Sequence, residues 1–474
     1  MNQEVEIFPS EREKLYKRLV DKLETANNLS RKVVSFQANK DRPVYRWFKY
    51  KEGFSSSLVK YFLNEYSPKP GKILDPFAGI GTTLFAAQEI GWKSFGIELL
   101  PVGTFTMRAR EATENIDLEK LNQAISDFWK QLKKIGNDKI HYEHIPISKF
   151  AFPEKTEGLI NKFLSYCNTI EDNNVKVILK FALFAILEEI SYTRKDGQYL
   201  RWDSRSKREL AGKPFNKGKI LSFNEALRYK FNQIITDLTQ CKSTTLFEQF
   251  EKHGSAQYPI KIIEGSCLKE LPKFEDNYFD FTITSPPYCN RYDYTRTYAL
   301  ELVYLGYNNE QVRDLRQSML SCTVENKEKI EYLNELYSSL GKSEVFDEVL
   351  KTYNESSAMT EVNSVLEILN EHERLNNNNI PRMVKNYFLE MSFVIFEMAR
   401  IIKHNGYCVM VNDNVRYGGE EIPVDLILSE FAESFGFRIK KIFVLPKGKG
   451  NSSQQMGNYG RTEVRKCVYL WQKK

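Results

Sequence analysis

Short apolar runs alternate with amphipathic stretches near the start of the chain. Residues 72–75, Lys-Ile-Leu-Asp, and residues 94–97 have the length and apolar content of buried strands. Apolar positions three and four residues apart predict helices over 56–66 and 82–90. Strands separated by helices indicate an α/β protein with a mainly parallel sheet that helices cover on both faces.

The same alternation returns in the second half of the chain. Strand patterns cover 260–264 and 279–284. The C-terminal part predicts a helix over 384–402, a strand over 407–412, a helix over 423–435, and strands over 439–445 and 466–471. The last two strands are joined by a loop and predict an antiparallel hairpin at one edge of the sheet. Such a sheet binds its ligands at the carboxyl ends of its strands.

Three stretches precede or interrupt this alternation. Residues 1–40 predict a helical leader, because a charged helical pattern runs from Glu11 to Asn28. Residues 111–255 are mostly helical in pattern, and residues 307–385 are charged, helical and rich in asparagine, so both are expected to be insertions. The core is then discontinuous and consists of residues 41–110, 256–306 and 386–474.

Positive charge is concentrated in two zones, although the formal net charge of the whole chain is only +6. Residues 194–219 hold nine Lys/Arg against three Asp/Glu, follow an apolar helix pattern over 175–192, and are predicted to form an exposed loop. Residues 438–466 hold eight Lys/Arg against one acidic residue. Such zones are typical of phosphate binding, while a solvated charged surface is the alternative interpretation.

Several classes of protein and site are excluded by composition. The seven cysteines are scattered, with the closest two, Cys267 and Cys289, 22 positions apart, so we expect reduced thiols and no metal site. No window approaches the run of about 20 apolar residues that spans a membrane. The first residues are charged and lack an apolar signal core, so we expect a cytoplasmic protein.

A glycine-containing loop follows the strand at 72–75 and has the sequence Asp75-Pro-Phe-Ala-Gly79-Ile-Gly81-Thr-Thr. Its glycines allow a tight turn and close approach to a ligand, and Glu98, 23 positions after Asp75, suits two ribose hydroxyls. Neither a complete GxGxxG nor a P-loop is present, and Asp75 repels phosphates but attracts an ammonium group. S-adenosylmethionine is therefore favoured over a dinucleotide.

This loop resembles motif I (DPFxGxGTT) of the DNA amino-methyltransferases, and residues 48–59 resemble the motif X that precedes it. Gly265-Ser266-Cys267 resembles motif III of the same family. The resemblance implies a Rossmann-like class I S-adenosylmethionine methyltransferase sheet with two largely helical insertions. By the same match, the cofactor pocket consists of Phe54, Ser55, Asp75, Pro76, Phe77, Gly79, Gly81 and Thr82, with Glu98 on the ribose and Ser266 near the adenine.

Thr284-Ser285-Pro286-Pro287-Tyr288 closes the strand at 279–284 and resembles the family's catalytic (D/N/S)PP(Y/F) motif. In this interpretation the Ser285 hydroxyl and the Pro286 carbonyl accept the N–H groups of an exocyclic amine, whose lone pair is otherwise delocalised into the ring. Pro287 stiffens the turn, and Tyr288 stacks on the base. The base must leave the duplex to reach this pocket.

Serine at the first motif position is associated in this family with cytosine-N4 methylation, and adenine-N6 methylation is the alternative. A cognate restriction endonuclease in a restriction-modification system is an expectation of the resemblance. An RNA base methyltransferase is a rival interpretation, although the first 40 residues leave little room for an RNA-binding domain. A second rival is a non-catalytic DNA-binding specificity subunit, which the intact motifs argue against.

Contacts with double-stranded DNA are expected from basic residues in three places. Arg291 and Arg296 alternate with tyrosines after the catalytic motif, where a partly buried helix face is the alternative. The other candidates are Arg201 and Arg205 in the first insertion and Lys447, Lys449 and Arg461 in the C-terminal loop. Residues 307–385 are the candidate target-recognition region, and residues 111–255 are the alternative.

Overall fold

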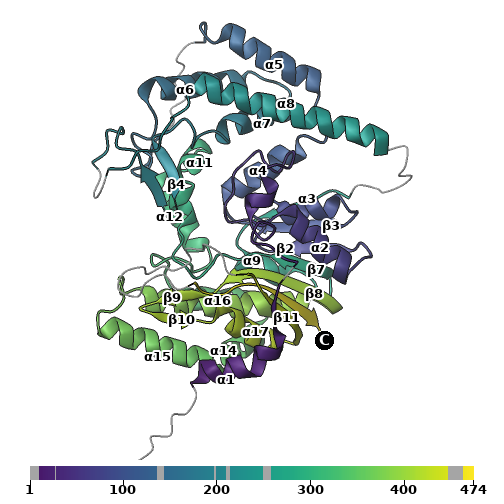
Figure 1. The fold of residues 1–474 in the computed structure, drawn as a ribbon, viewed down its shortest axis with the longest axis vertical. Coiled ribbons are helices and arrows are strands. Elements are labelled where there is room, and N and C mark those ends of the chain that lie inside the picture. The colour runs from purple at the N-terminus through teal and green to yellow at the C-terminus, as the bar shows by residue number, and fades with distance from the viewer. Residues whose placement is uncertain are drawn as a thin grey trace, which may run out of the picture.

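The computed structural model describes residues 10–474 apart from 27, 136–142, 197–198, 210–213, 249–257 and 447–462. The described chain forms two lobes (Figure 1). The lower lobe is built on a large sheet, and the upper lobe consists mainly of helices α5 to α8. No helix in the described ranges is long and apolar enough to cross a membrane. Those ranges also contain no group of three or more His, Cys, Asp or Glu side chains suited to a metal ion.

Among the described residues, eight strands form the main sheet in the order β1-β11-β12-β8-β7-β2-β3-β6. Neighbours pair in parallel except at β12, which runs antiparallel to both β11 and β8. The strands are β1 Leu23–Thr25, β2 Lys72–Asp75, β3 Lys93–Glu98, β6 Lys261–Glu264, β7 Phe279–Thr284, β8 Ile402–Asp413, β11 Phe437–Val444 and β12 Lys466–Lys473. The expected α/β class with a mostly parallel sheet is confirmed.

The sheet is covered on both faces, and successive buried side chains of a central strand enter two different apolar clusters. On β8, Val409 and Val411 pack with helices α2 (Ser56–Tyr66) and α3 (Thr82–Gln88) in one buried cluster. The intervening Cys408 and Met410 belong to the cluster on the other face. That face is covered by α9 (Cys267–Glu270), α16 (Ile380–Ile401) and α17 (Val424–Ser434).

The N-terminal leader differs from its prediction. Helix α1 covers only Glu11–Leu19, a 3-10 turn follows over Val20–Lys22, and β1 then pairs with β11, with Leu23 opposite Ile442. Strand pairing overrides the helical pattern here, because β11 offers an open edge for hydrogen bonds. The hairpin of β11 and β12 exists, but it is not at the edge: β12 lies inside the sheet and β1 is outermost.

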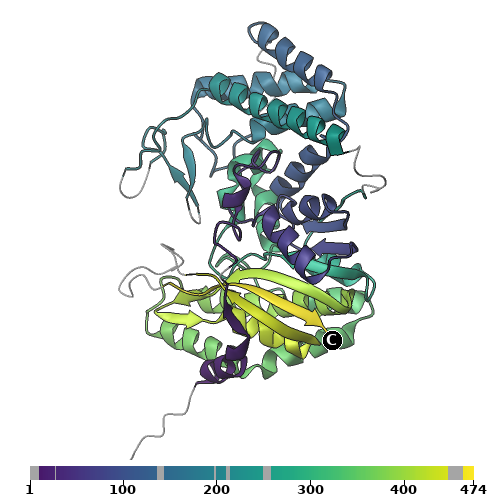
Figure 2. The ribbon, with the colours of Figure 1, turned by 45° about the vertical axis from the view of Figure 1, so that its right-hand side comes forward.

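The upper lobe has its own buried cluster, to which helices α4 to α8 all contribute. These helices are α4 Pro101–Glu111, α5 Leu118–Gln131, α6 Glu154–Asn168, α7 Asn173–Phe184 and α8 Phe223–Glu248. The helix expected over 175–192 is shorter in the structure, because α7 ends at Phe184. The loop expected over 194–219 begins with a two-stranded antiparallel ribbon of β4 (Thr193–Asp196) and β5 (Tyr199–Trp202), which projects from this lobe in Figure 2.

Residues 307–385 divide between the two lobes. Helix α12 (Asn309–Ser318) packs with the upper cluster through Val312 and Leu315. Helices α13 (Ile330–Ser339), α14 (Ser343–Glu355) and α15 (Ser357–Glu371) pack with α16, α17 and α1 beneath the sheet, as Figure 1 shows for α14 and α15. Three further short pairs of elements complete the described fold: helices α10 (Tyr294–Thr297) and α11 (Ala299–Tyr304), the ribbon of β9 (Val415–Tyr417) and β10 (Glu420–Ile422), and 3-10 turns at Phe36–Asn39 and Leu271–Lys273.

Candidate active site

Two neighbouring parallel strands, β2 and β7, end side by side at the candidate site. Strand β2 ends at Asp75, before the glycine-containing loop, and β7 ends at Thr284, before Ser285. The Thr284 hydroxyl donates a hydrogen bond to Asp75 Oδ1 at 2.7 Å. Two motifs about two hundred residues apart in sequence are thereby joined at the carboxyl edge of the sheet, where such sheets bind ligands.

The loop after β2 depends on glycine at two positions. Gly79 and Gly81 have φ values of 55° and 78°, in the left-handed region that glycine adopts without strain. A Cβ on Gly81 would also lie 2.7 Å from Met107 Cγ. The N-terminal turn of α4 packs equally closely, since a Cβ on Gly103 would collide with the Gly79 carbonyl. The loop is thus fixed tightly against α3 and α4.

The Asp75 carboxylate organises this loop from within. It accepts hydrogen bonds from the Phe77 N–H at 3.0 Å and the Thr83 hydroxyl at 2.7 Å, in addition to Thr284. Burial raises the pKa of Asp75 to about 6, and these donors act against that rise. The carboxylate has up to four lone-pair sites, so it retains acceptor capacity for a ligand.

Glu98, at the end of β3, accepts two backbone hydrogen bonds. Gly79 N–H donates to Oε2 at 2.5 Å, and Leu100 N–H donates to Oε1 at 2.6 Å. Burial raises the pKa of Glu98 to about 8, and the backbone donors oppose that rise. Each oxygen keeps a second lone pair, so the carboxylate can still accept two hydroxyl groups of a ligand.

These residues line a cavity with an empty volume of about 790 Å³, which we call the glycine-loop cavity. Eight of the ten residues predicted to bind the cofactor line it: Phe54, Asp75, Pro76, Phe77, Gly79, Thr82, Glu98 and Ser266. The other two predicted residues, Ser55 and Gly81, are not among the residues described as lining this cavity. The Ser55 hydroxyl instead caps α2 by accepting from Leu58 N–H at 3.3 Å and donates to the Val33 carbonyl at 2.6 Å. Gly81 serves the turn into α3.

The glycine-loop cavity has the chemistry that S-adenosylmethionine requires. Its walls combine two buried carboxylates with apolar side chains, including Ile80, Leu99 and Leu100. Carboxylates suit ribose hydroxyls and an ammonium group, while apolar walls suit a purine ring. The aromatic rings of Tyr50 and Phe54 also line it, and ring faces attract cations such as a sulfonium.

Ser285 lies in the wall between this cavity and a second one. Its hydroxyl is within hydrogen-bonding distance of the Val411 carbonyl, at 3.1 Å, and of the Tyr288 hydroxyl, at 3.3 Å. Donation of the single hydroxyl proton to Val411 leaves the oxygen lone pairs available as acceptors. Of the other predicted catalytic residues, Pro287 lines the glycine-loop cavity and Tyr288 lines the second cavity, whereas Pro286 is buried and is not among the residues described as lining either cavity.

The second cavity, which we call the tyrosine cavity, has an empty volume of about 1500 Å³. Its aromatic lining consists of Phe54, Tyr288, Tyr292 and Tyr294. Glu52, Gly53, Phe54, Ser285 and Tyr294 line both cavities and form their shared wall. A planar aromatic ligand in the tyrosine cavity would therefore lie beside the occupant of the glycine-loop cavity, with Ser285 between them.

Charged residues also line the tyrosine cavity. Asp413, at the end of β8, forms an ion pair with Lys466 of β12. Burial raises the pKa of Asp413, and Lys466 opposes that rise. The next residue, Asn414, also lines this cavity. Asn412 is buried elsewhere and donates to the Tyr387 hydroxyl at 2.9 Å.

Sequence reasoning missed several residues of this site. Glu52 accepts hydrogen bonds from the hydroxyls of Tyr292 and Tyr298, the latter at 2.5 Å, and so joins residues 48–59 to the segment that follows Tyr288. Its position two residues before Phe54 was the available signal. Met319 and Leu320 also line the glycine-loop cavity, but no motif marks them, because they come from residues 307–385.

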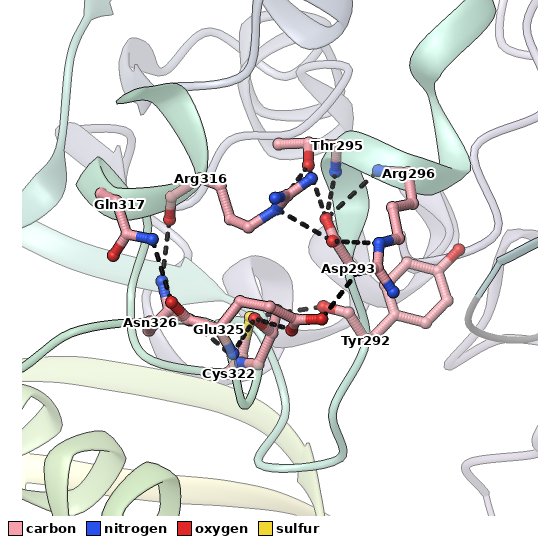
Figure 3. A network of polar contacts seen from close by, with 10 residues as sticks. Tyr292, Asp293, Thr295, Arg296, Arg316, Gln317, Cys322, Glu325 and Asn326 are labelled. Carbon is pink, nitrogen blue, oxygen red and sulfur yellow. Dashed lines mark hydrogen bonds and ion pairs between the residues drawn. The ribbon is translucent and has the colours of Figure 1, made fainter. Parts of the chain in front are cut away.

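Arg296, expected to contact DNA, is exposed and takes part in the polar network shown in Figure 3. Asp293 caps α10 and forms ion pairs with Arg296 at 3.2 Å and with Arg316 of α12 at 3.0 Å. Arg296 also pairs with Glu325 at 2.9 Å. This network binds the segment after the catalytic motif to the segment that supplies Met319 and Leu320. Arg291 lies nearby and donates to Asn376 at 2.7 Å.

Most cations described in the 194–219 zone have internal partners, so its charge overstates its affinity for phosphate. Arg205 pairs with Asp203 at 2.7 Å, and burial lowers the pKa of Lys217, which donates to the carbonyls of Glu188 and Ser191, to about 8. Arg201 instead places its guanidinium 4.1 Å from the centre of the Phe215 ring. Lys447, Lys449 and Arg461 lie outside the described residues.

Comparisons with known proteins find relatives that match nearly the whole chain. The chain is 48% identical to the type II methyltransferase M.AvaI of Nostoc sp. and of Anabaena variabilis over 465 residues, or 97% of this chain and 92% of the relative. It is 42% identical to the type II methyltransferase M.BsoBI of Geobacillus stearothermophilus, over 98% and 92% of the two chains. Residues 3–101 match the model of a family described as DNA methylase. No solved structure matches the chain.

Proposed function

The chain belongs to the type II DNA methyltransferases of the amino-methylating family, and from that premise we propose that it transfers a methyl group from S-adenosylmethionine to the N4 amino group of cytosine in duplex DNA. The observation that carries the proposal is the position of Ser285 in the wall shared by the two cavities. A methyl donor on one side and a flipped base on the other would meet at this residue.

The glycine-loop cavity would hold the cofactor, which supplies an electrophilic methyl group when bound. Glu98 would accept the ribose hydroxyls through the lone pairs that Gly79 and Leu100 leave free. Asp75 would attract the ammonium group of the methionine moiety. Pro76, Phe77 and Thr82 complete the wall around it, and Ser266 lies on the side formed by the loop after β6.

Ser285 and Pro286 would activate the target amine. The amine lone pair is delocalised into the ring, and two acceptors placed for its N–H bonds favour a tetrahedral nitrogen whose lone pair is localised. The Ser285 oxygen can serve as one acceptor because its own proton is directed to Val411. The Pro286 carbonyl is the second acceptor. The methylated nitrogen would carry a positive charge and lose its extra proton to solvent, so no side chain has to act as a strong base. Positioning and hydrogen bonding carry the catalysis.

Cytosine is favoured over adenine because serine occupies the first position of the catalytic motif. In the family that this motif resembles, serine at that position is associated with cytosine-N4 methylation. The aromatic lining of the tyrosine cavity can stack on either base. The site residues and the division into a discontinuous core and two insertions are part of the same proposal. So is a role in a restriction-modification system with a cognate endonuclease, a system to which the type II relatives belong by name.

Labelled methyl transfer tests the proposal directly. The purified chain is incubated with labelled S-adenosylmethionine and duplex DNA, and modified bases are identified after digestion by mass spectrometry. We expect N4-methylcytosine, and sequencing of the modified DNA then maps the recognition site. N6-methyladenine would overturn the choice of base alone. Transfer to transfer RNA but not to duplex DNA, or DNA binding without any transfer, would overturn the proposed reaction.

A further inference from the structure

We infer that the ribbon of β4 and β5 in the first insertion reads the target sequence, with Arg194 and Arg201 contacting base edges in the major groove. The inference rests on the proposed function and adds the surface that selects the DNA site. It also reverses the expectation that residues 307–385 carry target recognition.

The ribbon has one buried face and one outward face. Thr193 pairs with Trp202 and Lys195 with Leu200, and all four side chains are buried. Arg194 pairs with Arg201 in the same register, so both arginines lie on the opposite face. Arg194 is exposed there and Arg201 is half-buried against the Phe215 ring. The outward face thus carries two arginines at paired positions.

The buried face fixes the ribbon to the active site. Lys195 forms an ion pair with Glu301 of α11 at 2.5 Å, and the two side chains are only 6% and 2% exposed. The Lys195 ammonium also lies 4.4 Å from the centre of the Tyr298 ring, and Tyr298 donates to Glu52 of the shared wall. The Lys195 carbonyl accepts a hydrogen bond from Lys51, which lines the tyrosine cavity.

A rigid link of this kind is what sequence reading requires. A buried ion pair contributes little net stability, but it fixes the position of the groups that it joins. The base to be methylated lies a fixed number of steps from the bases that are read, so the reading surface must keep a fixed distance from Ser285. The major groove admits a two-stranded ribbon, and arginine bound to guanine is the commonest specific contact there.

The second insertion is less suited to this role. Helices α13, α14 and α15 bury Leu333, Val349 and Val362 in the same cluster as Leu74 of the central strand β2. They form part of the core beneath the sheet, as Figure 1 shows for α14 and α15, whereas the ribbon projects outward in Figure 2. A module that reads DNA has to expose its contacts rather than bury them.

The test uses the full chain with Arg194→Gln and Arg201→Gln. We measure kcat/KM on a duplex with the mapped recognition site and on duplexes that each carry one changed base pair. We expect each variant to lose about 10- to 100-fold of the wild-type preference at one base pair, the range for a lost arginine–guanine contact. Lys351→Gln on α14 removes the same charge from the second insertion and is expected to change nothing.

Other outcomes overturn the inference. One such outcome is an equal fall in activity on all duplexes, together with a slope of log affinity against log salt concentration that is smaller by about one for each arginine removed. The arginines would then contact only phosphates. Unchanged discrimination in both variants also overturns it. Cofactor affinity, measured by calorimetry, should match the wild type in every variant. If the wild-type chain methylates no duplex, the proposed function fails. That result would be known before any variant is compared, so it is distinct from failure of this inference.

Discussion

The two cavities that meet at Ser285 are built in different ways. The glycine-loop cavity is walled largely by short segments that each contribute several consecutive residues, such as 75–80 and 97–100, and its carboxylates accept hydrogen bonds from nearby backbone N–H groups. The lining of the tyrosine cavity is spread more widely along the chain, from Arg31 to Lys466, with short runs such as 51–54 and 413–415. Asp413 and Lys466 form an ion pair in its wall. Its empty volume is also about twice as large.

This difference matches the two occupants that we propose. A small cofactor needs a site that is complete before it binds, and local hydrogen bonds provide one at little conformational cost. A base that swings out of a duplex needs an open site whose walls come from the parts of the chain that hold the DNA. Changes in one cavity should therefore alter one ligand and spare the other, and the following experiments test that separation.

The largest effect is expected at the residue that the cavities share. Ser285→Ala removes an acceptor for the target amine, so we expect kcat to fall by about 100- to 1000-fold, the range for loss of one preorganised hydrogen-bonding group. Cofactor affinity should stay within about twofold of the wild type by calorimetry. Thr284 donates to Asp75 from the adjacent position, and Thr284→Val serves as a comparison that should weaken cofactor binding instead. Near-normal turnover by the alanine variant would contradict the assigned role.

The next effect is expected for Glu98→Gln. Loss of the charged acceptor should weaken cofactor affinity by about 10- to 150-fold, equivalent to about 1.5–3 kcal/mol for a hydrogen bond to a charged group. The matched control is Glu264→Gln, because Glu264 lies opposite Glu98 in the register of β6 and β3 but is half-exposed and paired with Arg108. Calorimetry should show no change for that control. Equal losses in both variants would mean that Glu98 does not bind the ribose.

The raised pKa of Glu98 predicts a pH effect on the same step. Hydroxyl donors favour the ionised carboxylate, so a proton must leave when the ligand binds below the pKa of about 8. Cofactor affinity should then rise by up to about tenfold per pH unit towards pH 8 and level off above it. Calorimetry in two buffers of different ionisation enthalpy measures the released proton. Proton release that persists in Glu98→Gln would assign the titration to another group, such as Asp75.

The smallest effect is expected for Asp413→Asn in the tyrosine cavity. Loss of its charge leaves Lys466 without its ion-pair partner in a partly buried wall, and we expect the KM for DNA to rise by about three- to tenfold. Cofactor affinity should not change. The surface pair of Lys441 and Glu24 lies farther along the same sheet, and Glu24→Gln should leave both constants unaltered. A weaker cofactor affinity in Asp413→Asn would show that the cavities are not independent.

The sequence predicted those parts of the site that consist of contiguous residues. The strand at 72–75, its loop and the strand at 279–284 are found where their patterns place them, because buried strands and glycine turns have strong local signals. Eight of the ten expected cofactor residues line one cavity for the same reason. Ser55 was misplaced because a serine before a helix is as well suited to capping as to binding.

The remaining features depend on contacts that no local pattern contains. A count of charges does not show that Arg205 and Lys217 have partners within the protein. From the sequence alone, residues 194–219 are therefore expected to form a free basic surface. The strand at 23–25 forms only because β11 is there to pair with it. Met319 and Leu320 reach the glycine-loop cavity through the ion pairs of Asp293 and Arg316, which join segments with no shared motif.

The place of β12 in the sheet has a consequence for folding. This strand runs between β8 and β11 and carries the buried side chains of Tyr469 and Trp471. Until β12 is inserted, the facing flanks of β8 and β11 have no hydrogen-bond partner and can pair with strands of other molecules. The lower lobe is therefore expected to be most prone to aggregation before β12 takes its place.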